Sequence, residues 1–235
     1  MRKRLILMLA SCLIVGAKPV LGITIDDFSV GPIIVERTGA SGVTQLQSGL
    51  DPEHVIGGSR RFIVGDSGAV GQAAEVDTVA RELRFYIDLG LGYHRLTYGA
   101  DAPLSLDLIA TGHDAFQLDF IDAVGQPPLW LTVSSPVGGN VVSETVSLVA
   151  VPVMTLSNGV KRALFDFGWF SGIDLTNVSS IELHSVRVGR DMTLKSLSTV
   201  IPEPSSVLLV ALGSATVAFC SRRSSKFAAG ERGRV

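Results

Sequence analysis

The chain has 235 residues, a formal net charge of −2 and two cysteines, Cys12 and Cys220. The charge is unevenly distributed, because residues 23–200 hold 20 acidic and 11 basic side chains while both ends are basic. An acidic body excludes nucleic acid as a partner, since phosphates need clustered lysine and arginine, and a body without cysteine excludes an internal disulfide.

The first 22 residues are predicted to form a cleavable signal peptide. A positive leader, Met1-Arg2-Lys3-Arg4, is followed by an apolar stretch from Leu5 to Val15 and then by small residues. This order is typical of secretory leaders. The apolar stretch is shorter than an ordinary membrane span. We expect cleavage after Ala17 or Gly22.

Residues 23–200 are predicted to form one all-β domain, an antiparallel β-sandwich. Their number suits a single core. Apolar and polar side chains alternate within them, which puts one face of each strand in the core and the other in water. The alternating segments are residues 83–89, 104–108, 116–120, 129–133, 181–183 and 192–197.

The rest of the body has a weaker pattern. Residues 141–153 are rich in valine and threonine and are interpreted as one strand or a bent pair. Residues 168–177 are predicted to hold one or two short helical turns. The Gly/Ser-rich residues 38–59 and 65–80 are predicted to be long loops.

The last 35 residues have three parts. The motif Ile201-Pro202-Glu203-Pro204 comes first, an apolar segment over residues 205–221 follows, and a basic tail over residues 222–235 begins with Arg222-Arg223. These parts resemble the PEP-CTERM sorting domain of Gram-negative bacteria. The resemblance implies a transmembrane helix over the apolar segment and recognition of the motif by an exosortase-type transpeptidase. A plain C-terminal anchor is the alternative.

The sorting resemblance also implies where the protein resides. Proteins with such a tail are exported, anchored in the membrane of the cell envelope and then released to the cell surface or the extracellular matrix. They occur typically in species that make exopolysaccharide, so an exopolysaccharide is a candidate partner. The positive ends of the chain fit this membrane handling.

The body resembles a second family through short pieces. These are Ile25-Asp26-Asp27-Phe28, Val55-Ile56-Gly57-Gly58-Ser59-Arg60, Phe165-Asp166-Phe167 and residues 172–181. They are similar to galactose-binding-like jelly rolls, which include several carbohydrate-binding modules. The resemblance implies a jelly-roll sandwich whose first and last strands lie side by side.

That strand arrangement makes three carboxylates a candidate calcium site. Asp26 and Asp27 open the first strand, and Asp191 opens the last. Calcium binds six to eight oxygen ligands, which carboxylates supply. The alternative is that these are ordinary charged residues at the ends of strands.

Aromatic side chains are the candidates for carbohydrate binding. Trp130 and Tyr86 each stand between two apolar residues of a predicted strand and are expected to point away from the core. Tyr93 and Tyr98 flank a predicted turn. Exposed rings of this kind stack on the faces of sugars. Burial beneath a loop is the alternative.

The body shows no catalytic signature, and we predict a non-catalytic structural or matrix-interaction protein that binds carbohydrate. The histidines are scattered at His54, His94, His113 and His184. No two of them have the spacing of zinc ligands. Asp107 and Asp119 fall on the polar faces of predicted strands, where charge is ordinary and does not indicate a glycosidase pair. A secreted hydrolase of unrecognised type that acts on polysaccharide is the alternative function.

Overall fold

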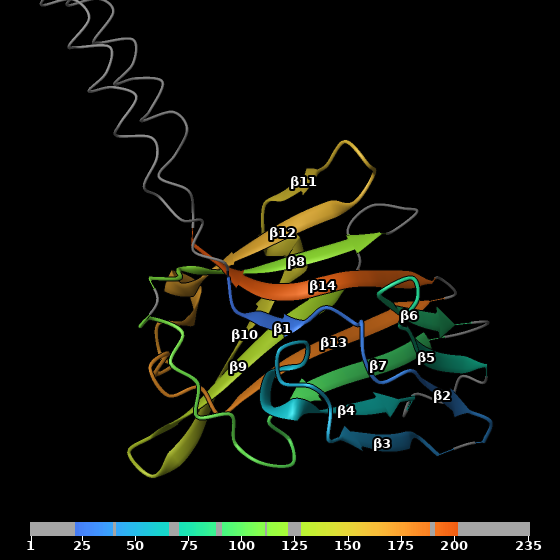
Figure 1. The fold of residues 1–235 in the computed structure, drawn as a ribbon, viewed down its shortest axis with the longest axis horizontal. Coiled ribbons are helices and arrows are strands. Elements are labelled where there is room, and N and C mark those ends of the chain that lie inside the picture. Colours follow the sequence, from blue (N-terminus) through green and yellow to red (C-terminus); the bar gives the residue numbers. More distant parts are fainter. Residues whose placement is uncertain are drawn as a thin grey trace, which may run out of the picture. The chain divides into compact units, whose positions relative to one another are not determined.

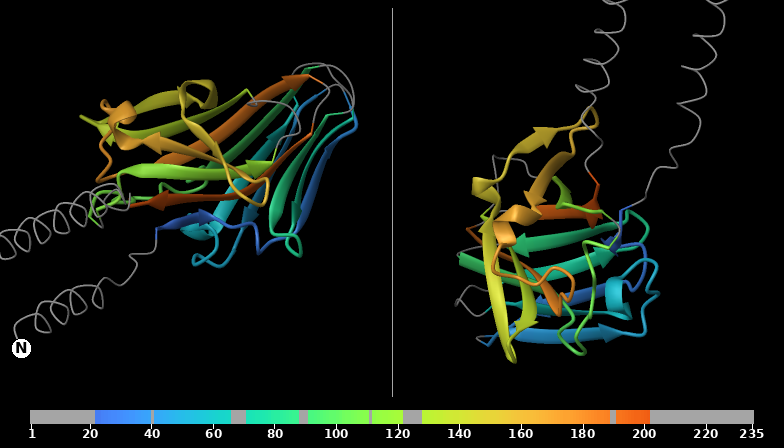
Figure 2. Two further views of the ribbon diagram at one scale, coloured as in Figure 1. Left: turned by 90° about the horizontal axis from the view of Figure 1, so that it is seen from above. Right: turned by 90° about the vertical axis from the view of Figure 1, so that its left-hand side faces the viewer.

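The computed structural model describes residues 22–39, 41–65, 71–87, 91–110, 112–121, 128–188 and 191–201. These residues form two antiparallel sheets that are stacked face to face (Figure 1, Figure 2). The predicted antiparallel β-sandwich is therefore confirmed. The predicted signal peptide up to residue 21, the membrane segment and the sorting motif from Pro202 onward lie outside the described residues.

Sheet A, the larger sheet, has the strand order β11-β12-β8-β14-β6-β5-β2, and β1 also pairs with β14. Its strands are β1 (Thr24–Asp26), β2 (Ile33–Arg37), β5 (Gln72–Asp77), β6 (Glu82–Ile87), β8 (Ala115–Ile121), β11 (Val153–Thr155), β12 (Lys161–Asp166) and β14 (Met192–Val200). The first half of β14 pairs with β6, and its second half pairs with β1. The first and last strands of the body therefore lie side by side, as the jelly-roll resemblance implies.

Sheet B has the strand order β10-β9-β13-β7-β4-β3. Its strands are β3 (Val43–Ser48), β4 (Ser59–Val64), β7 (Leu91–Tyr98), β9 (Leu129–Val137), β10 (Asn140–Ser147) and β13 (Ser180–Val188). Three short 3₁₀ turns accompany the sheets: η1 (Ile56–Gly58), η2 (Leu148–Ala150) and η3 (Phe167–Phe170).

The core lies between the two sheets and is filled by alternate side chains of the strands. In β9, Leu129, Leu131 and Val133 are fully buried, whereas Trp130 and Thr132 lie on the other side of the strand. This alternation follows from the pleat of a strand, which sends successive side chains to opposite faces.

Aromatic packing closes one part of the core. Phe116 of β8 makes edge-on contacts with Phe167 at 4.9 Å and with Phe170 at 5.7 Å between ring centroids. The sequence predicts core positions for Trp169 and Phe170, which follow Phe165 and Phe167. The structure buries the three phenylalanines, but Trp169 is 41% exposed because the η3 turn directs its side chain outward.

Several predicted element boundaries are wrong. Residues 38–59 and 65–80, predicted as loops, contain β3 and β5. In β5 the buried positions are Gln72, Ala74 and Val76, and two of these are not strongly apolar, which hides the alternation. Residues 104–108 form no regular strand, because Ser105 has a φ of 50° and only Leu106 makes a bridge.

Residues 141–153, predicted as one strand or a bent pair, form a bent pair. Strand β10 belongs to sheet B, the η2 turn follows, and β11 belongs to sheet A. The chain therefore crosses from one layer of the sandwich to the other within this segment.

Candidate functional site

An aromatic strip lies on the outer surface of sheet B, where β9, β13 and β7 run side by side (Figure 1). Trp130 of β9 is in register with His184 of β13, and their rings stack with centroids 5.0 Å apart and planes 11° apart. His184 is in register with Arg95 of β7, and its ring lies 6.5 Å from that of Tyr93. We call Trp130, His184, Tyr93, Arg95 and Glu182 the aromatic face.

The polar groups of the aromatic face hold one another in place. Arg95 Nε donates to Tyr93 Oη at 2.6 Å, and the Arg95 guanidinium lies 5.3 Å from the centroid of the Tyr93 ring. Glu182 pairs with Arg95 at 3.2 Å and accepts a hydrogen bond from Thr97 Oγ1 at 3.3 Å. The side chains of Arg95, Glu182 and His184 are 39%, 21% and 23% exposed, so a ligand can reach them. Because they are already ordered, little conformational entropy is lost on binding.

The pairing of β9, β13 and β7 brings these residues together, and the sequence predicts only some of them as binding residues. Trp130 and Tyr93 are among the predicted binding residues, whereas His184, Arg95 and Glu182 are not. The alternation of Glu182 and His184 with buried neighbours in β13 shows that they point outward. It does not show that β13 lies between β9 and β7, which is what places them beside the aromatic rings.

Tyr86, another predicted binding residue, lies on the outer surface of sheet A. It points away from the core, as its alternation predicts, but it is on the opposite sheet from Trp130. Its hydroxyl donates to Glu75 Oε2 at 2.7 Å and lies 3.5 Å from Arg84 Nη1. The structure therefore does not bring Tyr86 to the aromatic face.

Tyr98 is not a surface residue, and its prediction as a sugar-binding residue is wrong. Its side chain is fully buried, and its hydroxyl donates to Asp26 Oδ2 at 3.0 Å. Tyr93 and Tyr98 are five residues apart on β7, so the alternation of the strand sends them to opposite faces. Burial raises the pKa of the Tyr98 hydroxyl well above its ordinary value.

The predicted calcium ligands are not brought together. Asp26 is in register with Leu197 of β14, six residues beyond Asp191, which corresponds to about 20 Å along the strand. Asp26 is fully buried and Asp191 is exposed. Within the part of the chain that the structure describes, no group of three or more His, Cys, Asp or Glu side chains could hold a metal ion. The first and last strands do pair, but Asp191 lies outside that pairing, next to the half of β14 that pairs with β6.

Asp26 has a structural role instead. Its Oδ2 pairs with Arg60 Nη1 at 2.7 Å, and Arg60 Nη2 donates to the carbonyls of Val30 and Gly31, each at 2.7 Å. Burial raises the pKa of Asp26, and the charge of Arg60 opposes that shift. With Tyr98, this cluster joins β1 of sheet A to β4 and β7 of sheet B.

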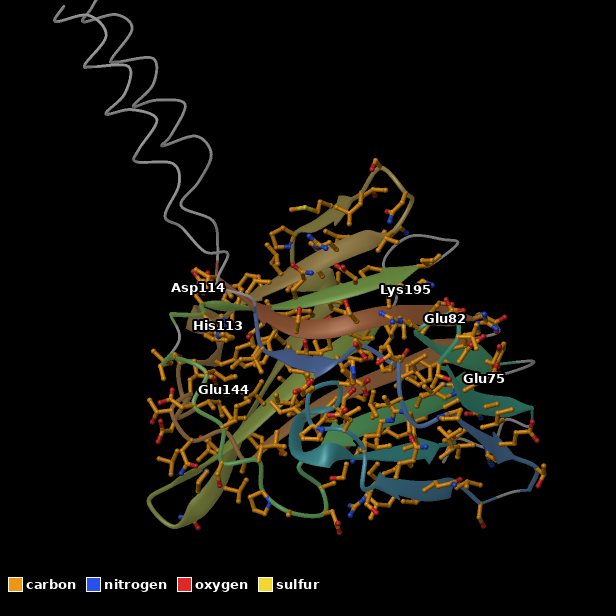
Figure 3. All side chains as sticks on the ribbon, in the orientation of Figure 1. Glu75, Glu82, His113, Asp114, Glu144 and Lys195 are labelled. Atoms are coloured by element: carbon orange, nitrogen blue, oxygen red, sulfur yellow. The ribbon has the colours of Figure 1, made fainter. Side chains whose placement is uncertain are left out.

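The outer surface of sheet A carries paired charges. Glu82 is paired with Lys195 and Arg84, and Figure 3 labels Glu82 and Lys195 on this surface. Arg162 donates to both carboxylate oxygens of Asp119 at 2.8 Å. A shallow groove of about 650 Å³ lies beside this surface, between residues 32–34 and 75–79. These carboxylates are engaged in ion pairs, and Trp130 and Tyr93 lie on the other sheet.

Residues 200–223 match the PEP-CTERM protein-sorting motif. The match spans the predicted motif residues Pro202, Glu203 and Pro204 and the arginines Arg222 and Arg223, so the sorting resemblance is confirmed. The motif implies export and sorting at the membrane. Within residues 22–201, as far as the structure describes them, no helix has the length and apolar character of a membrane span.

No curated protein matches this chain. Among solved structures, a family 11 carbohydrate-binding module of a Clostridium thermocellum cellulase has 12% identity and a TM-score of 0.38, with 78% of this chain and 96% of that chain covered. A family 30 carbohydrate-binding module from the same organism has 12% identity and a TM-score of 0.42, with 78% and 99% covered. A cellulase derived from that of Rhodothermus marinus has 11% identity and a TM-score of 0.41, with 72% and 99% covered. At such low scores, these likenesses say nothing about what this chain binds.

Proposed function

We propose that this chain is an exported, non-catalytic protein of the cell envelope or extracellular matrix that binds carbohydrate through the aromatic face. The stacked pair of Trp130 and His184, with Tyr93 beside it, carries this proposal. It is a group of rings on the outer surface of a sheet, within reach of solvent.

The chemistry of the face suits a sugar chain. A sugar ring presents apolar C–H faces and a rim of hydroxyls, so its site needs flat apolar rings beside polar groups in fixed positions. Trp130 and Tyr93 supply the rings. Arg95, Glu182 and Thr97 supply donors and acceptors, and their mutual hydrogen bonds fix their positions.

The sorting motif supports the location. In this proposal an exosortase-type transpeptidase recognises Pro202-Glu203-Pro204 and the chain is held at the membrane, then released to the cell surface or matrix. The matched residues 200–223 support export and sorting at the membrane. An exopolysaccharide is then the carbohydrate nearest to the protein.

A binding experiment with the full chain in mild detergent tests the carbohydrate proposal. Electrophoresis through gels that contain polysaccharides, neutral and acidic, should show retardation of the wild type by at least one of them. Trp130→Ala should abolish that retardation, and Trp169→Ala, an exposed tryptophan in η3, should leave it unchanged. If none of the polymers retards the wild type, or if only Trp169→Ala abolishes retardation, the proposed site is wrong.

The alternative of a secreted hydrolase has one supporting observation. Burial and the nearby charge of Asp166 raise the pKa of Asp114, and a carboxyl with a raised pKa is a candidate general acid. Asp114 lies beside His113 at the start of β8 (Figure 3). Release of reducing sugar from a retained polymer, abolished by Asp114→Asn, would favour the hydrolase. Retention without release favours binding.

A further inference from the structure

The outer surface of sheet B differs in charge from the rest of the body. Among the side chains that the structure describes on the outward positions of its six strands, the charged ones are Arg61, Arg95 and Glu182, and His184 is the one histidine. Two guanidinium groups therefore stand against one carboxylate. The body as a whole has the opposite balance, with 20 acidic and 11 basic residues over 23–200.

The two arginines lie on the same sheet surface as the aromatic rings, at different distances from them. Arg61 of β4 is in register with Thr97 of β7, and Thr97 is in register with Glu182 of β13. Trp130 stands two strands from Arg95 and three strands from Arg61, about 10 Å and 14 Å across the sheet at the usual strand spacing. A ligand that stacks on Trp130 and touches Arg61 must be a chain of several units.

Arg61 has donors to spare. Its Nη2 donates to the carbonyl of Ala100 at 3.1 Å, and no carboxylate of the described residues lies within ion-pair distance of it. A guanidinium has five N–H donors in a planar fork, which matches the two oxygens of a carboxylate. On sheet A, by contrast, Arg84 and Arg162 are both paired with acidic side chains of the same sheet.

We propose that the ligand of the aromatic face is an acidic polysaccharide whose sugar units carry carboxylates, as uronic acids do. This inference rests on the proposed carbohydrate binding and adds the class of sugar. The aromatic rings stack on the sugar rings, and Arg61, supported by Arg95, binds a carboxylate. The acidic body repels a polyanion at long range. Attraction therefore depends on direct contact between the arginines and the carboxylates of the polymer.

The test compares one polymer with and without its carboxylates. Polygalacturonate and its carboxyl-reduced form have the same backbone linkages, so they differ at the group that Arg61 is proposed to bind. Affinity electrophoresis of the full chain in mild detergent should show retardation by polygalacturonate at least about tenfold stronger than by the reduced polymer, the size expected for a charge-assisted hydrogen bond.

Variants identify the residue responsible. Arg61→Gln should lose most of the preference for the carboxylated polymer, and Arg61→Lys should keep part of it. Arg81→Gln removes the same charge from an exposed turn next to sheet A and should change nothing. Trp130→Ala should abolish retardation by both forms.

The possible results distinguish failure of the acidic ligand from failure of carbohydrate binding itself. Equal retardation by both polymers, lost in Trp130→Ala, would overturn the acidic ligand and leave carbohydrate binding standing. No retardation by either polymer, while a neutral polysaccharide of another type retards the wild type, would also overturn it. Retardation by dextran sulfate as strong as by polygalacturonate, and unchanged in Trp130→Ala, would show unspecific attraction of polyanions. This result would also overturn the acidic ligand. If no polysaccharide retards the wild type, both carbohydrate binding and the acidic ligand are overturned.

Discussion

Asp26 is a charged side chain placed between two sheets of apolar residues. Its carboxylate is tolerated because Arg60, Tyr98 and the backbone N–H of Phe28 all bind it. Removing one partner of a buried ion pair leaves the other charge uncompensated, which is far more destabilising than the pair itself is stabilising.

We therefore expect Asp26→Asn to lower the free energy of unfolding by about 3–5 kcal/mol. Urea unfolding followed by tryptophan fluorescence measures this change. Asp101→Asn, at an exposed loop position, is the matched control and should change the free energy by less than about 0.5 kcal/mol. A loss below about 1 kcal/mol for Asp26→Asn would mean that Arg60 finds another partner.

His54 is the second residue whose chemistry is set by its neighbours. Its Nδ1 lies 2.9 Å from Asp27 Oδ2 and 3.0 Å from Ser29 Oγ. A catalytic Ser-His-Asp triad uses both ring nitrogens, one for the serine and one for the aspartate. Here the Asp27 carboxylate and the Ser29 hydroxyl both contact His54 Nδ1. The cluster therefore links two loops and does not activate the serine.

This contact makes part of the stability depend on pH. The hydrogen bond to Asp27 and then its charge raise the pKa of His54 above the ordinary 6.5. A folded pKa raised in this way means that the stabilisation is complete below pH 6.5 and is lost as the pH rises through the higher folded value.

The difference in Tm between the wild type and His54→Gln should accordingly be largest at acidic pH and should shrink as the pH rises. The Asp27→Asn background should remove this pH dependence, because the partner charge is gone. A difference that stays constant from about pH 5 to about pH 9 would show that the contact does not titrate in this range.

At the scale of elements, Gly99 shows why β7 must end where it does. It has a φ of 79°, and a Cβ built on it would lie 2.3 Å from the carbonyl oxygen of Ser179. The segment after it runs beside residues 178–179, just before β13, where the N–H groups of Leu104 and Leu106 donate to the carbonyls of Ser179 and Val178. A side chain at Gly99 would push this segment away from the sheet.

Gly99→Ala should therefore destabilise the protein by about 1–3 kcal/mol more than Gly112→Ala. Gly112 has a similar φ of 76° but nothing within 4 Å of a built Cβ, so its substitution carries only the backbone penalty. Thermal unfolding of both variants provides the comparison. Equal losses would mean that the segment after Gly99 moves without resistance.

At the scale of the whole molecule, charge is divided among the parts of the chain. The body is acidic, the outer surface of sheet B carries two arginines against one glutamate, and residues 201–235 are basic. The basic tail follows the apolar segment of the matched sorting motif. In membrane proteins generally, positive charge that flanks an apolar segment biases its orientation.

Replacing Pro202-Glu203-Pro204 by three alanines should block processing of the tail. The unprocessed chain should then accumulate in the membrane fraction, and intact-mass measurement should find its basic end still attached. Substituting Ser205 and Ser206, just beyond the motif, by alanine is the control and should leave processing unchanged. If the triple variant is processed and released like the wild type, the tail works as a plain anchor.

Local patterns along the chain are enough to predict the class of fold, to show which strand side chains face outward and to identify the sorting motif. Alternation in β6, β8, β9 and β14 is a local property, and so is the PEP-CTERM motif at residues 200–223. Each of these is set by neighbours along the chain, so it is readable without knowing which strands meet. Alternation accordingly predicted that Trp130 and Tyr86 both point outward.

Which of these side chains share a surface depends on how the strands pair in three dimensions. Register and strand order placed His184 between Trp130 and Arg95, put Tyr86 on the other sheet and turned Tyr98 into the core. They also left Asp191 far from Asp26, although the first and last strands pair. Hydrogen bonds between distant strands fix register, and a shift of one residue would reverse every face, so a local pattern does not contain this information.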